Sequence, residues 1–321
     1  MNLDLVLEIL PTKSKKHFDD IRYSRVLGAN RHINMIGTIL KDTVISSNTE
    51  EEVIKNTKII SDYYKETRGN QSRAVYNALS VMTNNIEQID YTSLDDFKNK
   101  IIKKIDSYDH ESKEKVEKIV EYTNNITKDM DSILVYDYSS TLNEFLTNAS
   151  KKMDIYIPES RALNGGFPFV ESAKEFGHKV HFFPDFNSFE VLKKCDAAMI
   201  GVESFYPDGT IFNTIGSEII AILCKERKIP FYALTPLIKV DSRNIQGIKR
   251  LSPMEYNFEE RIAKDWEENI KSGVDFNGIK LVEIDPELIT AIVTEEGVIP
   301  ANAMFDISLN YLERLEEGLH D

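Results

Sequence analysis

Three polar residues with different chemistry are spaced along one segment of the chain, between residues 199 and 241. Glu203 offers a carboxylate, Asn213 an amide and Lys239 an ammonium group. Glu203 directly follows residues 197–202, a short apolar run typical of a strand that is buried on both faces. Ligands of parallel α/β sheets bind beyond the carboxyl ends of the strands. We therefore expect these three side chains at a ligand-binding edge.

The elements that position these residues form a strand–loop–helix–strand unit. The sequence from Pro207 to Gly209 predicts a turn, because proline presets φ and glycine accepts positive φ. Apolar spacing predicts a helix from Ser217 that ends before Pro230, and residues 231–234 follow as the next strand. This succession predicts a right-handed parallel βαβ unit.

Two segments in the first half of the chain are candidate anion sites. Gly28 and Ala29 precede a predicted helix, and backbone N–H groups at a helix N-terminus favour anions. Arg68 also precedes a predicted helix, and its guanidinium group is a planar, permanently charged partner for phosphate. Taken alone, the Gly28–Ala29 segment is better explained as an ordinary turn, and Arg68 as a surface arginine in a loop.

The pattern of the whole chain predicts an α/β protein with two domains. Residues 1–126 lack strand alternation and have helical spacing, whereas the polar segment 123–131 marks a change of domain. Beyond it, strands alternate with helices; the predicted strands cover residues 132–136, 153–158, 180–184, 195–202 and 231–234. We therefore predict an N-terminal helical domain, 1–126, followed by a Rossmann-like domain with a mostly parallel sheet, 127–321.

Composition excludes several classes of partner. The 321 residues are 41% hydrophobic and 29% charged, and the net charge of −14 opposes nonspecific nucleic-acid binding. No apolar run approaches the ~18 residues of a membrane span, and the N-terminus does not have the pattern of a signal peptide. We expect a cytoplasmic protein with no direct nucleic-acid partner and no membrane partner.

Familiar cofactor motifs are absent from the sequence. No Gly-x-Gly-x-x-Gly follows any predicted strand, and no P-loop occurs. His178 and His181 are not accompanied by the cysteines or carboxylates that would complete a metal site. Cys195 and Cys224 lie in apolar runs and are expected to be buried thiols. We predict neither a cofactor nor a protein-only metal site.

The segment first described resembles the signature of the initiation factor 2B family. The resemblance is carried by short motifs at Gly201–Glu203, Asp208–Gly209, Asn213–Ser217, Pro230–Tyr232 and Lys239–Asp241. That family holds the α, β and δ subunits of eukaryotic translation initiation factor 2B. It also holds isomerases for methylthioribose-1-phosphate and ribose-1,5-bisphosphate.

The resemblance implies a catalytic pair at two altered positions. In the isomerases, a cysteine after the first strand of the sheet domain and an aspartate after the fourth act as acid and base. Asp137 stands at the cysteine position and Glu203 at the aspartate position. Two carboxylates facing one ligand would raise the pKa of one and keep the other ionised. The pair could then isomerise a phosphorylated pentose between aldose and ketose without a redox cofactor.

The resemblance also implies ligand contacts. Gly28, Ala29 and Arg68 match segments that approach the bound sugar phosphate, although Gly69 and Asn70 replace the Pro-Thr of the family. Further along the chain, Arg161 matches a phosphate-binding arginine and Asn213 the asparagine that orients the sugar. Thr214 stands where the family has lysine, so Lys239 is a candidate replacement for that cation.

Two serines are ambiguous. Ser139 and Ser140 open a predicted helix, where hydroxyl side chains are usually caps, and they are also candidate phosphate contacts.

The resemblance leaves two functions open. The chain is either an isomerase that binds its sugar phosphate between the two domains or a non-catalytic regulatory or ligand-sensing subunit, since the initiation factor α subunit also has Glu at the position of Glu203. In both cases the partners are a phosphorylated sugar or nucleotide-like small molecule and a second copy in a homodimer.

Overall fold

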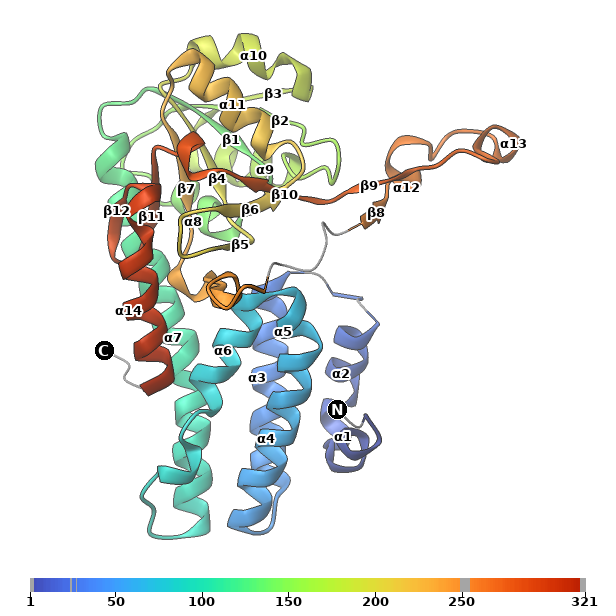
Figure 1. Cartoon of the computed structure of the whole chain (residues 1–321), viewed down its shortest axis with the longest axis vertical. Coiled ribbons are helices and arrows are strands. Elements are labelled where there is room, and N and C mark those ends of the chain that lie inside the picture. The colour runs from blue at the N-terminus through green and yellow to red at the C-terminus, as the bar shows by residue number, and fades with distance from the viewer. Residues whose placement is uncertain (1–2, 24, 27, 249–254, 318–321) are drawn as a thin grey trace. The chain divides into compact units, whose positions relative to one another are not determined.

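The computed structural model describes residues 3–23, 25–26, 28–248 and 255–317 (Figure 1). The chain forms two compact units. Unit 1 comprises Met1–Glu114, Ile238–Val240 and Leu309–Asp321, and unit 2 comprises Lys115–Leu237 and Asp241–Ser308. No helix among the described residues is long and apolar enough to cross a membrane.

Unit 1 is helical throughout its described part, as the sequence predicts. Its elements are α1 (Leu3–Ile9), η1 (Thr12–Ser14), α2 (Lys15–Arg22), α3 (Ala29–Ser46), α4 (Glu50–Glu66), α5 (Arg68–Gln71), α6 (Arg73–Thr83) and η2 (Ile86–Gln88). Helix α4 begins with reciprocal capping: Thr49 accepts a hydrogen bond from the backbone of Glu52, and the Glu52 carboxylate accepts one from the backbone of Asn48. Buried Ile33, Ile36 and Leu40 form the core-facing side of α3.

Two helices contribute residues to both units. Helix α7 (Leu94–Thr127) is a single 34-residue helix, and α14 (Met304–Glu317) is the last helix of the chain. In α7, Phe97 and Ile101 are buried in unit 1, whereas Ile119 belongs to the hydrophobic core of unit 2.

Unit 2 contains a seven-stranded sheet in the order β12-β11-β7-β4-β1-β2-β3. Its strands are β1 (Ser132–Tyr136), β2 (Asp154–Pro158), β3 (Lys179–Phe183), β4 (Ala197–Gly201), β7 (Phe231–Leu234), β11 (Ala291–Thr294) and β12 (Gly297–Ile299). All neighbours are parallel except β11 and β12. Strand β1 is central: Ile133 is paired with Ile155 on one side and Ala197 on the other. The expected Rossmann-like, mostly parallel sheet is confirmed.

Helices connect these strands. They are α8 (Ser140–Thr147), α9 (Phe167–Phe176), α10 (Ser188–Val191) and α11 (Ser217–Arg227). Short 3-10 helices complete the connections: η3 (Asp185–Asn187), η4 (Leu192–Lys194), η5 (Leu237–Lys239), η6 (Ser242–Asn244), η7 (Pro286–Leu288) and η8 (Ala301–Ala303). Phe145 of α8 and Phe169 of α9 are fully buried against strand residues such as Val135. This packing explains why the strands are apolar on both faces.

A second, three-stranded sheet is not predicted from sequence: two of its strands lie in the predicted loop after Glu203, and the third comes from a later part of the chain. It has the order β10-β6-β5 and is antiparallel: β5 (Ser204–Phe205), β6 (Ile211–Thr214) and β10 (Leu281–Ile284). The predicted turn is the tip of the β5–β6 hairpin, where Gly209 has a φ of +90°. The strands escape prediction because β5 has two residues and β10 comes from a distant part of the sequence.

The segment between β7 and β10 includes a small arm, which Figure 1 shows extending away from the seven-stranded sheet. The arm consists of β8 (Glu255–Asn257), α12 (Glu259–Ile262), α13 (Glu268–Lys271) and β9 (Asn277–Ile279), with β8 and β9 antiparallel. The longer segment that contains the arm, from Asp241 to Lys280, is tied to the three-stranded sheet at both ends. The backbone N–H of Asp241 donates to the Phe205 carbonyl at 2.8 Å, and that of Ile215 donates to the Lys280 carbonyl at 2.9 Å.

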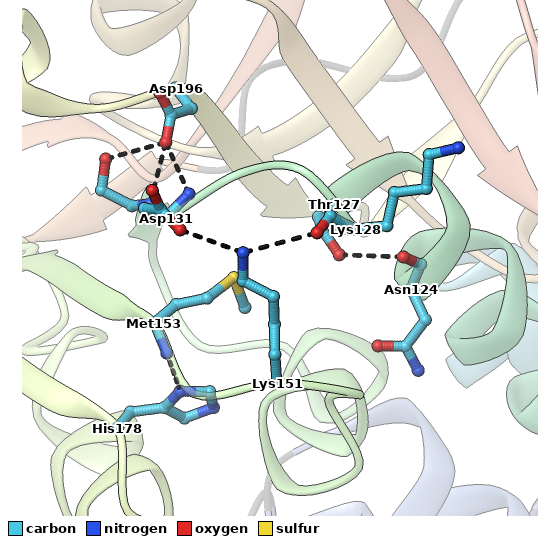
Figure 2. A network of polar contacts seen from close by, with 9 residues as sticks. Asn124, Thr127, Lys128, Asp131, Lys151, Met153, His178 and Asp196 are labelled. Carbon is cyan, nitrogen blue, oxygen red and sulfur yellow. Dashed lines mark hydrogen bonds and ion pairs between the residues drawn. The ribbon is translucent and has the colours of Figure 1, made fainter.

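A polar network fixes the amino ends of the central strands (Figure 2). The Asp196 carboxylate, just before β4, accepts hydrogen bonds from the backbone N–H groups of Asp131 and Ser132 at 2.8 and 2.9 Å. Lys151 pairs with Asp131 at 3.0 Å, and the backbone of Met153 donates to Nδ1 of His178 at 3.1 Å. The polar groups at this edge are therefore used in holding strands together.

Candidate functional site

The candidate site lies at the opposite, carboxyl edge of the sheet, where the direction of strand succession reverses. From β1 the chain adds β2 and β3 on one side, and then returns to add β4 and β7 on the other. The connections on the two sides of such a switch point diverge, and the crevice between them is the usual ligand site of open α/β sheets. Asp137 follows β1 directly and Glu203 follows β4 after one residue. Both predicted catalytic residues thus follow the two strands that define the switch point.

Asp137 is held tightly in an unusual backbone conformation. Its φ is +56° and its side chain is buried, with 8% of the residue exposed. Ser160 donates a hydrogen bond from Oγ to Oδ1 of Asp137 at 3.0 Å. On another side, a Cβ added to Gly165 would lie 1.8 Å from that same oxygen. The carboxylate therefore fills the space that a side chain at position 165 would occupy.

The environment of Asp137 favours its protonated form. Burial raises the pKa of the carboxyl, and it outweighs the lowering effects of the hydrogen bonds from Thr214 and Ser160 and of the Lys280 charge. The raised pKa was expected from a second carboxylate, whereas burial is its cause here. A carboxylic acid kept protonated closer to neutral pH can donate a proton to a reacting oxygen.

Ser160 is positioned by a carboxylate from the neighbouring strand. Ser160 is fully buried with a φ of +49°. The Asp185 side chain, after β3, accepts hydrogen bonds from the backbone N–H groups of Ser160 and Arg161, both at 2.8 Å. Arg161 keeps its side chain 60% exposed, with Nη1 at 3.9 Å from the Glu159 carboxylate. The backbone of Arg161 is therefore fixed, whereas its guanidinium group is accessible to solvent.

Glu203 and Asn213 are brought together by the three-stranded sheet. The backbone N–H of Glu203 donates to the Phe212 carbonyl at 2.9 Å, which places Glu203 beside the residue before Asn213. Glu203 is half-buried, and Asn213 is 7% exposed in β6. The Nδ2 atom of Asn213 has no hydrogen-bond partner among the described residues. A buried donor left unpaired costs about 1–3 kcal/mol, so a polar ligand would stabilise this position.

The two predicted serines have different roles. Ser139 caps α8, because its Oγ accepts a hydrogen bond from the backbone of Leu142 at 3.4 Å. Ser139 also packs closely on β4, since a Cβ added to Gly201 would lie 2.1 Å from the Cβ of Ser139. Ser140 is exposed at the first residue of α8. Phosphate binding by these two residues stays a prediction.

Three predicted ligand contacts, Gly28, Ala29 and Arg68, form a local group in unit 1. Gly28, with a φ of +99°, precedes α3, which begins at Ala29; Leu27 of the same motif lies outside the described residues. Arg68 opens the one-turn helix α5, which directly precedes the predicted helix α6, and its Nε donates to Nδ1 of His32 at 3.0 Å. Because Nδ1 accepts that bond, Nε2 carries the proton and donates to the Val26 carbonyl at 2.7 Å. Burial lowers the pKa of His32, which is consistent with this neutral form.

Lys239 also belongs to unit 1. The Nδ2 atom of Asn77, in α6, donates to the carbonyl groups of Ile238 and Val240 at 2.8 and 3.0 Å. These bonds hold the short segment around Lys239 against α6. The part of Lys239 in ligand binding stays a prediction, as does that of Gly28, Ala29 and Arg68.

Several residues around the site were missed as functional candidates. Ser160, Asp185 and Lys280 were given no role, and Thr214 was noted only as a missing lysine. A further one is Glu295 after β11, whose Oε2 accepts a hydrogen bond from the Leu237 backbone at 2.9 Å. Burial raises the pKa of Glu295, and its Oε1 has no hydrogen-bond partner among the described residues. Their position in the sequence could have indicated a role at the site, since Ser160, Asp185 and Glu295 each follow the carboxyl end of a strand.

The arrangement contains acid–base groups and hydrogen-bond donors but no evident metal cluster. Within the described ranges, no group of three or more His, Cys, Asp and Glu side chains could hold a metal ion. Cys195 and Cys224 are buried, and burial raises the pKa of both thiols to about 12, so neither is a ready nucleophile.

Comparison with known proteins connects this geometry to a family. Residues 29–301 match the model of the initiation factor 2 subunit family. The ribose 1,5-bisphosphate isomerase of Methanocaldococcus jannaschii is 26% identical over 228 residues, which cover 68% of this chain and 71% of that protein. The α subunit of translation initiation factor eIF2B from Dictyostelium discoideum is 23% identical over 286 residues, which cover 84% of this chain and 87% of that subunit.

A solved structure shares the fold. The 5-methylthioribose 1-phosphate isomerase of Pyrococcus horikoshii OT3 superposes with a TM-score of 0.73 at 20% identity, over 94% of this chain and 88% of that one. The family match spans the helical unit and the sheet unit alike, and it includes both strands of the switch point. This chain therefore belongs to the initiation factor 2 subunit family.

Proposed function

We propose that this protein binds a phosphorylated sugar at the carboxyl edge of β1 and β4 and interconverts its aldose and ketose forms. The observation that carries the proposal is the position of Asp137 and Glu203 after the two strands of the switch point. One of these carboxyls is buried with a raised pKa, and the other is half-buried. Relatives named as isomerases of phosphorylated pentoses support the choice of substrate class.

The proposed chemistry is a set of proton transfers on a sugar that carries a phosphate on its C1 oxygen. Protonated Asp137 donates its proton to the ring oxygen as the bond between C1 and that oxygen breaks, and the Glu203 carboxylate removes the proton from C2. The product of this step is an open-chain enol with a C1–C2 double bond and the phosphate still on the C1 oxygen. The C2 hydroxyl then returns a proton to Asp137 and protonated Glu203 gives its proton to C1, which yields the ketose 1-phosphate and restores both carboxyls. Acid–base catalysis of this kind contributes typically ~10²–10⁴-fold.

The remaining predicted residues would bind the substrate. The exposed guanidinium tip of Arg161 suits a phosphate group, and the unpaired Nδ2 of Asn213 suits a sugar hydroxyl or phosphate oxygen. In this proposal Ser160 and Thr214 orient Asp137 through hydrogen bonds.

A ligand screen followed by a turnover assay tests the proposal. Ribose 1,5-bisphosphate and 5-methylthioribose 1-phosphate at 100 times Kd should each stabilise a binding protein by about 2.7 kcal/mol in thermal unfolding. Arg161→Ala should remove the shift. Asp137→Asn and Glu203→Gln should keep it but reduce turnover by at least ~10². Unchanged turnover in both variants would exclude the carboxylate mechanism, and the absence of any ligand shift would exclude the binding site.

A second candidate is a non-catalytic, ligand-sensing subunit. Its support is the extended match to an initiation factor α subunit, which covers more of this chain than the match to the isomerase described above. This function predicts a ligand-induced stabilisation without product formation. Either function is proposed to operate in a homodimer, and light scattering at micromolar concentration that gives the 36.8 kDa monomer mass would contradict the dimer.

A further inference from the structure

Lys280 occupies a backbone position that is fixed directly beside the candidate site. The N–H of Ile215 donates to the Lys280 carbonyl at 2.9 Å, and the Ile215 carbonyl accepts a hydrogen bond from the Tyr136 hydroxyl at 3.1 Å. Tyr136 is the last residue of β1, immediately before Asp137. A single residue of the β6–α11 connection thus links Lys280 to the end of the central strand.

Lys280 lies at a bend directly before β10, next to the β6–β10 ladder. Asn213 is paired with Val282 in this antiparallel ladder, and Lys280 precedes Val282 by two residues. The buried amide of Asn213, whose Nδ2 lacks a hydrogen-bond partner among the described residues, is therefore a donor on the strand beside Lys280.

The surroundings of the candidate site are acidic, so a cation at this position would favour the binding of an anion. Asp137, Glu203 and Asp185 place carboxyl groups after three strands at this edge of the sheet, and the chain as a whole carries a net charge of −14. Lys280 lies close enough to Asp137 for its charge to lower the pKa of that carboxyl. Its Nζ also lies 5.7 Å from the centre of the Tyr256 ring, a cation–π distance, and the side chain is half-buried.

We propose that Lys280 is the lysine that binds a phosphate group of the ligand in this site, with the Asn213 amide as the adjacent donor. The assignment rests on the proposed sugar-phosphate function and makes it more specific. It differs from the choice favoured by sequence, Lys239, because the backbone of Lys280 is linked through Ile215 to Tyr136, the residue before Asp137. Thr214, the residue paired with Leu281 beside Lys280, is uncharged and bonded to Asp137.

The test compares four lysine variants by titration calorimetry with ribose 1,5-bisphosphate and, separately, with inorganic pyrophosphate. Lys280→Met should weaken binding of both probes roughly tenfold to a hundredfold, the effect of losing one charge-assisted hydrogen bond. Lys280→Arg should bind within a few-fold of wild type because it keeps the charge. Lys264→Met, an exposed lysine of the arm, should leave both affinities unchanged, and Lys239→Met, at the lysine favoured by sequence, should weaken binding less than Lys280→Met. Thermal unfolding of each variant without ligand checks that the fold is intact.

The outcomes separate this proposal from the function it rests on. Binding of either probe that is unaffected by Lys280→Met, or that falls equally with Lys239→Met, would overturn the assignment. Pyrophosphate binding that depends on Lys280 without any sugar bisphosphate binding would support the anion site but contradict the proposed substrate. A wild-type protein that binds neither probe would overturn both.

Discussion

Replacing Gly165 by alanine would test how tightly the fold packs around Asp137. The added Cβ would lie 1.8 Å from Oδ1 and 2.8 Å from Cγ of Asp137, whereas real Cβ contacts are essentially never shorter than 3.0 Å. The carboxylate would have to retreat by about 1.2 Å, which would disrupt its 3.0 Å hydrogen bond from Ser160. Overpacking costs about 1–3 kcal/mol and a lost buried hydrogen bond about 1 kcal/mol. We expect Gly165→Ala to lower the free energy of unfolding by roughly 2–4 kcal/mol.

A double-mutant cycle identifies the source of that cost. In an Asp137→Gly background the carboxylate is gone, and the next contact of the new Cβ is the Tyr138 backbone nitrogen at 3.2 Å. Glycine also accepts the φ of +56° at position 137. Gly165→Ala should then cost less than about 1 kcal/mol, which gives a coupling energy of about 1–3 kcal/mol.

Urea unfolding followed by circular dichroism measures all four corners of the cycle. Gly37→Ala in α3 is the control, because its new Cβ meets no atom closer than 3.6 Å and alanine favours helix by about 1 kcal/mol. The control should be as stable as wild type or more stable. Equal costs of Gly165→Ala in the wild-type and Asp137→Gly backgrounds would refute the packing argument.

Three further predictions follow from individual contacts. Burial raises the pKa of Asp137 in the folded protein. Wild type should therefore lose stability relative to Asp137→Asn as pH rises from the unfolded pKa of ~3.9 through the higher folded pKa. A difference in unfolding free energy between the two proteins that stays constant between about pH 4 and pH 8 would contradict this prediction. Burial lowers the pKa of His178, so the stability it contributes should be present above its ordinary value of 6.5 and be lost as pH falls through the folded pKa. His178→Ala should cost about 2–4 kcal/mol at neutral pH, because the Met153 N–H and the Leu146 carbonyl lose their partners, and should abolish that pH dependence in urea titrations. Asp196→Ala should cost about 1–2 kcal/mol by removing the acceptor of two backbone N–H groups, and it should leave ligand affinity unchanged in the thermal-shift assay because it acts at the amino edge of the strands.

The main sheet could be predicted from sequence because its strands are short apolar runs separated by helices. The ends of β1 and β7 agree with prediction, and β2, β3 and β4 differ by one or two residues. The three-stranded sheet could not be predicted in the same way. Its β5 strand is too short to show alternation, and β6 finds its partner β10 only after the whole of α11, β7 and the arm.

Some residues of the candidate site could likewise be predicted from sequence, and others could not. Asp137 and Glu203 could be placed at an edge because each directly follows a predicted strand. The partners of Asp137 could not, because a Ser160 hydroxyl and a Gly165 without a side chain act through tertiary proximity, which no local pattern encodes. Lys280 is a similar case, since its relation to Asn213 depends on the β6–β10 register. Lys239 was the better candidate in sequence only because it lies in the same motif.

The two ties at the base of the arm have an evolutionary consequence. Asp241 is bonded to β5 and Lys280 to the residue after β6, so the segment between them is attached at two points on the same small sheet. Everything between these points can change in length or sequence without altering the register of the strands that flank the switch point. Such a place accepts insertions cheaply, since lengthening a loop with fixed ends costs little entropy. Descendants of one ancestral fold could therefore acquire, replace or discard an arm here while keeping the same chemistry, and grafting a foreign segment between Asp241 and Lys280 is a practical route to new binding specificities.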